Sequence, residues 1–390
     1  MPQANRFRHQ AYTPTRPISP HYLLSPGSYP VVGSKPFRQR MREVGAALRA
    51  EGVAAIWLVH GSLDGPLAVR ALAELARVFP AAGPALRRVI HRLLEGPAGE
   101  VAQFTDRYAS ALDSGVNPPG QRPIPVHLFQ WSGENHHLGR ADAAVRLIDE
   151  LADLELRPGQ RALLWGHGHA GNVFALMTNL LAGHSDAAEQ FFQSAEVYYR
   201  WPILGLVDIP VWQRVRRRLR SGRSPLEGAA LDLVTFGTPI RYGWDSGGYS
   251  RLLHFIHHRP APGLPVYRAA WPPDLNDVLN AAGGDYVQQL GIAGTNSVPS
   301  VFAWRAGWAE RRLGRLVQPE RDNGPSPEPF CAGAIVPDEG TTLLVDYGEP
   351  GGTIAQHHAG HAVYARKRWL LFHAEEIVRR FYAAQACMVA

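Results

Sequence analysis

Short apolar runs that alternate with amphipathic stretches are the feature of this sequence that most restricts its fold. The amphipathic stretches have helical periodicity over 38–51, 141–154 and 171–181. The apolar runs have the length of buried strands, and they cover residues 53–59, 125–131, 161–165, 231–236 and 341–345. This alternation is typical of the α/β class, with a mainly parallel sheet flanked by helices. In such sheets functional residues gather at the carboxyl ends of the strands.

Composition narrows the protein class further. The chain has 390 residues, of which 45% are apolar, so it can bury the core of one large domain or two smaller ones. No apolar run reaches the roughly 20 residues of a membrane span, and the sequence starts polar rather than with a secretory signal. Its two cysteines, Cys331 and Cys387, cannot form a disulfide framework. We therefore expect a cytoplasmic protein without an integral membrane segment.

The charge of the chain is mildly positive. Its formal net charge is +6, but 34 acidic residues are interspersed with the 40 basic ones. One short run, Arg214–Arg220, is strongly basic, and it could be a solvated helix face or could contact anionic lipid or nucleic acid. Because the run is short and no nucleic-acid-binding motif accompanies it, we expect no nucleic-acid partner.

Proline content and interruptions of the alternating pattern suggest the domain organisation. Residues 1–36 are rich in proline and have little periodicity, which predicts an extended N-terminal arm. Residues 37–390 would then form the α/β domain, with two insertions at about 183–228 and 250–335. Insertions after sheet strands commonly form caps or lids over a site, although a scaffold helix pair explains the first insertion equally well.

The stretch Trp165-Gly-His-Gly-His-Ala-Gly-Asn-Val173 is the most informative motif, because it joins an apolar run to a helical stretch. Its glycines fit the pattern G-x-G-x-x-G, which binds dinucleotides at a helix N-terminus and would make the chain a nucleotide-binding oxidoreductase. However, the motif follows the third apolar run rather than the first, and Asp186, about 20 residues on, has no strand before it. The same glycines also fit a purely structural turn, or a nucleophile elbow of the form G-x-S-x-G with Gly168 at its centre.

In this context the chain resembles the α/β-hydrolase superfamily, and most closely its lipase- and esterase-like members, which carry Gly-His-Ser-His-Gly-Gly-Asn-Val at the elbow. Two further segments occur in the order of that family. Leu58-Val-His-Gly-Ser62 resembles the strand end that leads into the oxyanion loop, and Val234-Thr-Phe-Gly-Thr-Pro239 resembles a later strand of many lipases. The resemblance extends over about residues 53–365 and does not include the arm or the insertions.

The resemblance implies a catalytic triad, with the acid and the base following the elbow. It places the nucleophile position at Gly168, the acid at Asp346 and the base at His361. Backbone N–H groups for the oxyanion would come from His169 and from Gly61 or Ser62, which complete the candidate site. No cofactor is implied, and the ligand would be a small ester or a lipid-like molecule.

Several alternatives to these assignments remain open. Asp245 could replace Asp346 as the acid, and His357 or His358 could replace His361 as the base. Ser185 sits in a Gly-His-Ser-Asp-Ala stretch that superficially repeats the elbow, but it follows a helical segment. Histidine pairs and triplets occur at three places, yet none has the H-E-x-x-H pattern of a catalytic metal site, so no metal is expected.

Gly168 has no side chain, so no covalent acyl-enzyme can form at the elbow. Removing a triad nucleophile costs about six powers of ten in turnover. We therefore expect a nearly inactive protein, either an engineered inactive variant or a natural pseudoenzyme. The alternative from a different class is a non-catalytic module that binds a small ligand or a partner. Nothing in the sequence indicates the oligomeric state.

Overall fold

The structure is a computed structural model. It describes residues 7, 16–61, 103–200, 209–221, 226, 228–271, 273, 275–292, 304–317, 333–351 and 357–383. Three residues discussed above lie outside these ranges, namely Ser62, Cys331 and Cys387.

A single seven-stranded sheet forms the centre of the molecule, and all of its strand pairs are parallel. The strand order across the sheet is β1-β7-β6-β5-β4-β2-β3. The strands are β1 (His21–Leu24), β2 (Val53–Val59), β3 (Val126–Phe129), β4 (Arg161–His167), β5 (Ala230–Phe236), β6 (Arg251–His257) and β7 (Thr341–Val345). The α/β class expected from the alternating pattern is therefore confirmed.

The strands are apolar throughout because both faces of the sheet are covered. In β2, Trp57 and Val59 contribute to one core cluster, while Ile56 and Leu58 contribute to another on the opposite face. This division follows from the two-residue period of a strand, in which successive side chains point to opposite faces. Such double burial explains why the sequence shows continuous apolar runs rather than alternation.

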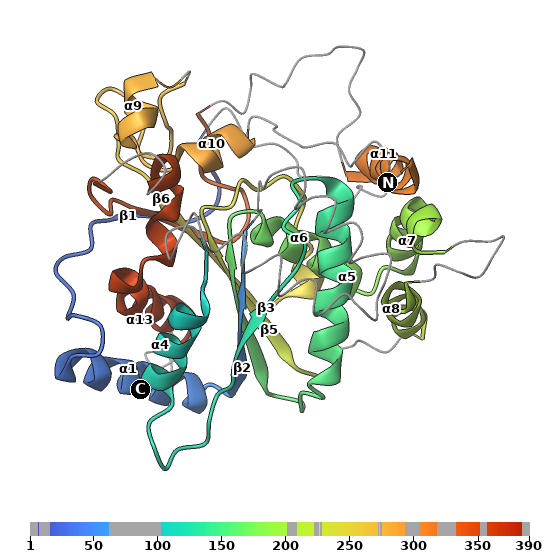
Figure 1. Cartoon of the computed structure of the whole chain (residues 1–390), viewed down its shortest axis with the longest axis horizontal. Helices are drawn as coiled ribbons and strands as arrows, with labels where there is room; N and C mark the ends of the chain where they lie inside the picture. The colour runs from blue at the N-terminus through green and yellow to red at the C-terminus, as the bar shows by residue number, and fades with distance from the viewer. Residues whose placement is uncertain are drawn as a thin grey trace.

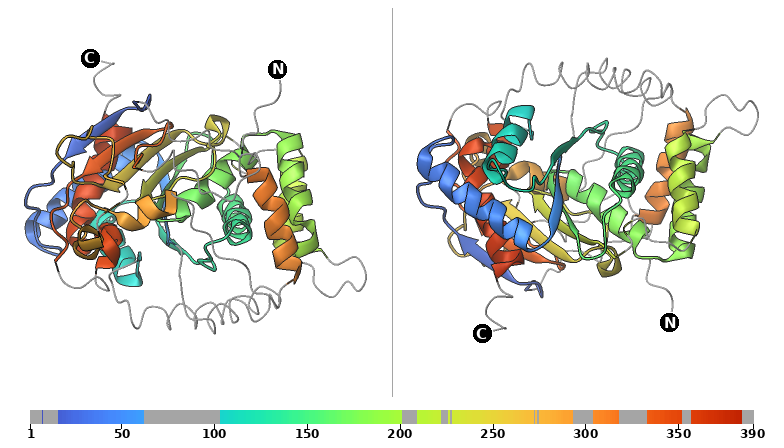
Figure 2. Two further views of the ribbon diagram at one scale, coloured as in Figure 1. Left: turned by 90° about the horizontal axis from the view of Figure 1, so that it is seen from above. Right: turned by 90° about the horizontal axis from the view of Figure 1, so that it is seen from below.

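One face of the sheet is covered by a single layer of helices, whereas the other is covered by two (Figures 1 and 2). The helices α1, α4 and α13 lie on one face, and α5 and α6 lie on the other, with α7, α8 and α11 packed outside α5 as a further layer. Their bounds are α1 (Lys35–Ala50), α4 (Asp106–Val116), α5 (His137–Asp153), α6 (Ala170–Leu181), α7 (Ser185–Tyr199), α8 (Pro210–Arg220), α11 (Trp304–Val317) and α13 (Leu370–Phe381).

Shorter helices connect these elements. They are α9 (Leu275–Asn280), α10 (Tyr286–Ile292) and the 3₁₀ helices η2 (Ser246–Gly248), η4 (His358–Ala365) and η5 (Lys367–Trp369). The segments expected to be helical from their periodicity correspond to α1, α5 and α6.

Two strands lie in segments that have no recognisable strand pattern in the sequence. The segment expected as an extended arm contains β1, which pairs with β7 at the edge of the sheet. The segment expected as the second insertion begins with β6, which pairs with β5 and β7 inside the sheet. Histidines at positions 254 and 257 interrupt the apolar run of β6, and both side chains are buried, at 1% exposure each. Because of these two buried histidines, the sequence of this central strand does not read as a continuous apolar run.

The basic run of the sequence forms most of α8, where several of its arginines are paired with acidic residues. Arg214 and Arg218 contact Asp149 of α5, and Arg216 contacts Glu189 of α7. These pairs tie α8 to its two neighbours, so the run has an internal structural role. None of the described helices combines the length and apolar character that crossing a bilayer requires.

Candidate functional site

The glycine turn follows β4, at the place in the sheet where the strand order reverses. From β2 the chain passes outward to β3, then returns to place β4 on the other side of β2. Gly61 follows β2 and Gly168 follows β4, and a Cβ atom built on Gly168 would lie 3.6 Å from the Gly61 Cα atom. Open α/β sheets bind ligands in the crevice at such a reversal. The topology therefore brings the two predicted loop segments together where a site is expected.

The turn at Gly168 is sharp and is held by the neighbouring strand. Gly168 has a φ angle of +51°, in the left-handed region that favours glycine. Its N–H donates to the Phe236 carbonyl oxygen at 2.8 Å, and its carbonyl oxygen accepts from the Thr238 hydroxyl at 2.7 Å. The helix α6 begins two residues later, at Ala170. The strand-turn-helix geometry expected for an elbow is present.

The other two glycines of the motif allow close packing. A Cβ atom on Gly166 would lie 2.5 Å from the Phe174 ring, and one on Gly171 would lie 2.8 Å from the Thr238 Cβ atom. Real Cβ atoms essentially never approach so closely. Gly166 and Gly171 are thus required by the packing of α6 against the sheet, whatever the site binds.

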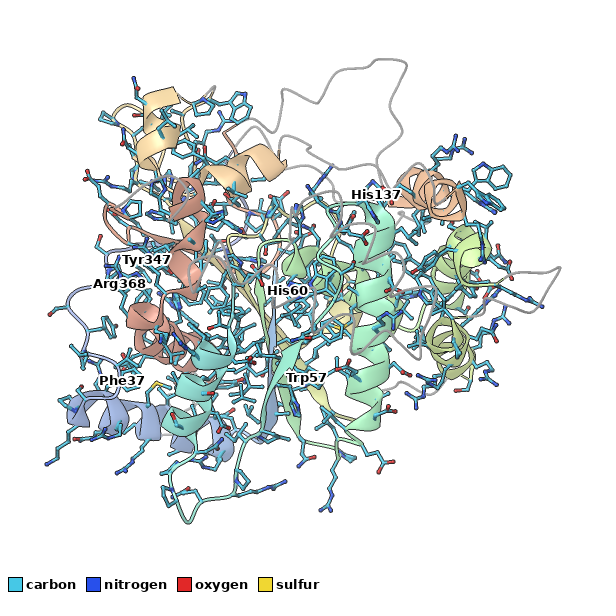
Figure 3. The ribbon with its side chains drawn as sticks, in the orientation of Figure 1. Phe37, Trp57, His60, His137, Tyr347 and Arg368 are labelled. Carbon is cyan, nitrogen blue, oxygen red and sulfur yellow. The ribbon has the colours of Figure 1, made fainter. Side chains whose placement is uncertain are left out.

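The chain directly after β2, at His60 and Gly61, is held by the His60 ring, which Figure 3 labels near the end of that strand. The His60 Nε2 atom accepts from the Trp131 backbone N–H at 3.2 Å, so the ring proton sits on Nδ1 and is donated to the Gly61 carbonyl oxygen at 2.8 Å. The Trp131 indole N–H in turn donates to the His60 carbonyl oxygen at 2.8 Å. These bonds leave the loop little freedom at Gly61.

A histidine–carboxylate pair lies over the turn. The His361 Nδ1 atom is 2.7 Å from the Asp285 Oδ2 atom, and the His361 Nε2 atom lies 2.9 Å from the position of a Cβ atom on Gly168. His361 is thus placed between a carboxylate and the centre of the elbow. An imidazole held in this way by a carboxylate can take a proton from a group at the elbow.

Asp285 is held firmly in place. Its side chain is fully buried, at 0% exposure. Its Oδ1 atom accepts from the Gln288 backbone N–H at 2.9 Å and so caps α10, while Oδ2 accepts from the Tyr364 hydroxyl at 3.0 Å as well as contacting His361. The Asp285 N–H donates to the His257 carbonyl oxygen at 2.9 Å, which fixes the residue at the end of β6.

A close backbone contact brings the histidine to this carboxylate. Three consecutive residues before His361 have positive φ angles, namely His358 (46°), Ala359 (49°) and Gly360 (93°). A Cβ atom on Gly360 would overlap the Gly284 carbonyl group, so these two backbones touch directly. Positive φ angles in non-glycine residues cost free energy and gather at functional sites. The strained segment here positions His361.

The two sequence-based candidates for the acid lie elsewhere. Asp346 follows β7 as expected, but its Oδ1 atom accepts from the Gly348 N–H at 2.9 Å and lies 3.5 Å from the Arg259 Nε atom. The expected contact between Asp346 and His361 is not found, and the carboxylate that meets His361 belongs to Asp285. Asp245 caps η2 through the Gly247 N–H and lies 3.6 Å from His184.

Sequence reasoning missed Asp285 because no apolar run directly precedes it. Along the sequence, Asp285 lies well past the last residue of β6, inside the segment expected as an insertion. One signal could have indicated it. Gly-Gly-Asp-Tyr places an acidic residue directly before a short helical stretch, which is the N-cap pattern.

The remaining candidates have other surroundings. Ser185 begins the exposed helix α7, where its hydroxyl lies 3.4 Å from the Asp186 carboxylate. Burial lowers the pKa of both His357 and His358. Within the described ranges, no group of three or more His, Cys, Asp or Glu side chains is arranged so that it could hold a metal ion.

Two buried histidines flank Gly168. The His167 Nε2 atom lies 3.2 Å from the His361 carbonyl oxygen, and the two rings are 4.3 Å apart between centroids. Burial, reinforced by the nearby His361, lowers the pKa of His167 well below its usual value. Since a neutral ring must carry its proton on the nitrogen that faces a carbonyl, His167 donates from Nε2 and helps hold the His361 backbone.

Comparison of the chain with protein-family models, with curated protein sequences and with solved structures gives no match. The architecture, a seven-stranded parallel sheet flanked by helices, is an α/β fold that is compatible with the α/β-hydrolase fold.

Proposed function

We propose that this chain carries the site of a carboxylic-ester hydrolase of the α/β-hydrolase fold in which the nucleophile side chain is missing. His361 is the base, Asp285 rather than Asp346 is the acid, and Gly168 occupies the nucleophile position. Backbone N–H groups of His169 and of the loop at Gly61 are the donors for an oxyanion. The ligand is a small ester or a lipid-like molecule.

One observation carries this proposal. His361 bridges the Asp285 carboxylate and the centre of a strand-turn-helix elbow, through 2.7 Å on one side and 2.9 Å to a Cβ position on the other. A hydroxyl at the elbow would find an imidazole ready to accept its proton, and the imidazole would find a carboxylate ready to orient it. This is the division of roles in the serine-histidine-aspartate mechanism.

As the chain stands, the proposal predicts ligand binding without covalent turnover. Acyl transfer in this fold needs an oxygen nucleophile, and glycine provides none, so the expected loss is about six powers of ten in turnover. A non-catalytic module for the same class of ligand is the second candidate, and the intact histidine–carboxylate pair beside an absent nucleophile favours it. Nucleotide binding has less support, because packing against Phe174 and Thr238 already accounts for Gly166 and Gly171.

Restoring the hydroxyl tests the proposal. We expect the unmutated chain to hydrolyse p-nitrophenyl butyrate at the background rate, and Gly168→Ser to raise the rate by at least about a hundredfold. The serine Cβ atom needs the His361 ring to retreat by a few tenths of an ångström, since 2.9 Å is too close for a real contact. Gly168→Ala is the matched control, because it adds the same Cβ atom without a hydroxyl.

A covalent label gives a second measurement. A fluorophosphonate reacts with an activated serine hydroxyl, which displaces fluoride and forms a stable phosphonate ester. Intact-mass spectra should show one adduct on Gly168→Ser and none on Gly168→Ala. The proposal fails if a folded Gly168→Ser protein neither hydrolyses the ester faster than Gly168→Ala nor takes up the label.

A further inference from the structure

A buried polar network extends from the elbow to the helix α5. Its central residue is Arg140 of α5, whose side chain is 0% exposed. The Arg140 Nε atom donates to the Tyr242 hydroxyl at 2.7 Å, and its NH1 group donates to the Asn135 Oδ1 atom at 2.9 Å. Tyr242 also contacts the His137 Nδ1 atom at 2.8 Å, and Figure 3 labels His137 at the start of α5. The network reaches the elbow through His169.

The network fixes which nitrogen of His169 carries the proton. The His169 Nδ1 atom lies 3.3 Å from the Arg140 NH1 group and 3.1 Å from the Asn172 Nδ2 group. Arginine can only donate. The Asn172 amide is oriented as a donor too, because its Oδ1 atom accepts from the Arg241 N–H and its Nδ2 group donates to the Pro239 carbonyl. His169 Nδ1 is therefore an acceptor, and the ring proton is on Nε2.

The ring also stays neutral. Burial lowers the pKa of His169 well below its usual value, and the positive charges of Arg140 and Arg241 lower it further. Protonation would place a cation next to two guanidinium groups inside the protein. His169 consequently presents one N–H donor, at Nε2, over the whole physiological pH range.

This donor is open to the site. In the described part of the chain, the Nε2 atom of His169 has no hydrogen-bond partner, yet it is not among the buried polar atoms that lack one. His169 keeps 8% of its surface exposed, while the opposite edge of its ring is occupied. Because the residue directly follows Gly168, this N–H lies close to the elbow.

We propose that the His169 side chain is a fixed N–H donor that binds a negatively charged oxygen of the ligand held at Gly168. Arg140 and Asn172 are its positioning residues, because they set its tautomer and orientation without reaching the ligand. Donors that are already oriented stabilise negative oxygen without reorganisation, and the two arginines behind the ring add favourable potential. The chemical class is an oxyanion, such as the carboxylate of a product acid. The inference rests on the proposed function for placing the ligand at Gly168.

Nitrogen NMR of the unmutated, ¹⁵N-histidine-labelled chain tests the tautomer directly. The signal that disappears in His169→Gln identifies the residue. We expect its Nε2 nitrogen to have the shift of a protonated ring nitrogen and its Nδ1 that of a bare one, unchanged between pH 5 and 8. In Arg140→Gln, which loses the cation and one donor, the ring should begin to titrate. A ring protonated on Nδ1, or one that titrates in the unmutated chain, would overturn the inference.

Butyrate binding tests the role and needs no esterase activity. We expect butyrate to shift the His169 signals, the neutral isostere butyramide to bind at least about tenfold more weakly, and His169→Phe to weaken butyrate binding by about tenfold or more. His127→Phe, on β3, is the matched control and should leave binding unchanged. Butyrate that binds equally to His169→Phe, or that leaves the His169 signals unmoved, contradicts the inference, whereas an inactive Gly168→Ser protein contradicts only the proposed function.

Discussion

The backbone of Gly360 lies directly against that of Gly284, so that a Cβ atom on Gly360 would stand 2.9 Å from the Gly284 carbonyl carbon and nearer still to its oxygen. This contact joins two segments that are far apart in the sequence. Asp285 follows one glycine and His361 follows the other, so a side chain on Gly360 would disturb the geometry of the pair at the site.

Gly360→Ala should therefore destabilise the fold. Its φ angle of 93° is unfavourable for alanine, and the new methyl group would push the two segments apart. Together these effects should lower the free energy of unfolding by at least about 2 kcal/mol. Urea titration of both proteins measures the loss.

Gly348→Ala is the control for this substitution. Gly348 also has a positive φ angle, of 78°, but nothing lies within 4 Å of its Cβ position. It should lose only the conformational term of about 1 kcal/mol. Equal losses in the two variants would show that the contact between Gly360 and Gly284 contributes nothing.

A second prediction distinguishes the two aspartates. In the Gly168→Ser background, Asp285→Asn should lower kcat by about 10⁴-fold, because the amide no longer holds His361 in the required tautomer. Asp346→Asn should change kcat by less than about twofold, since Asp346 contacts Arg259 and its own loop. Rates with p-nitrophenyl butyrate decide between them, and a greater loss in Asp346→Asn would restore the sequence-based assignment.

The sequence predicts the sheet well because burial on both faces leaves a strong local pattern. Runs such as Val53–Val59 can hardly be anything but buried strands, and the glycine turn after Arg161–His167 is encoded within nine residues. Gly168 and His361 could likewise be named from short motifs. The fold class and half of the candidate site are therefore accessible without coordinates.

The acid could not be named because its position depends on contacts between distant segments. Asp285 meets His361 only because Gly284 and Gly360 touch, and no local pattern records that approach. Strand β6 could not be recognised from the sequence for a related reason. Its histidines look polar in the sequence, yet in the fold His254 bonds to the Thr235 hydroxyl at 2.7 Å and is buried.

A third prediction concerns pH. Burial lowers the pKa of His373 to about 3, whereas the unfolded chain binds the proton near 6.5. Between these values the unfolded state holds more protons, so stability falls as pH falls below about 6.5, with a slope of up to about 1.4 kcal/mol per pH unit for this group. Above pH 7 both states are neutral at this position, and the contribution is constant.

His373→Gln should flatten this dependence. The amide cannot take up a proton, while it can still bond to the Tyr347 hydroxyl, which lies 2.7 Å from the His373 ring. Free energies of unfolding measured from pH 7 to 4.5 should converge for the two proteins as the pH falls. Curves that stay parallel would mean that His373 is not the group that resists protonation.

The fourth prediction concerns the arginine-rich helix α8. Asp149 of α5 is 8% exposed and accepts from both Arg214 and Arg218, so its loss removes a buried carboxylate from two guanidinium groups, of which Arg218 keeps its contact with Asp153. Asp149→Asn should lower the free energy of unfolding by about 1.5–3 kcal/mol, as for hydrogen bonds to charged groups.

Asp153 lies one helical turn further on, contacts the same Arg218 at 3.0 Å, and is 64% exposed. Asp153→Asn should therefore cost less than about 1 kcal/mol, and 0.5 M salt should remove more of its contribution than of Asp149's, because exposed pairs are screened more strongly. Urea titrations at low and high salt measure both effects, and equal costs for the two variants would show that the buried carboxylate contributes no more than the exposed one.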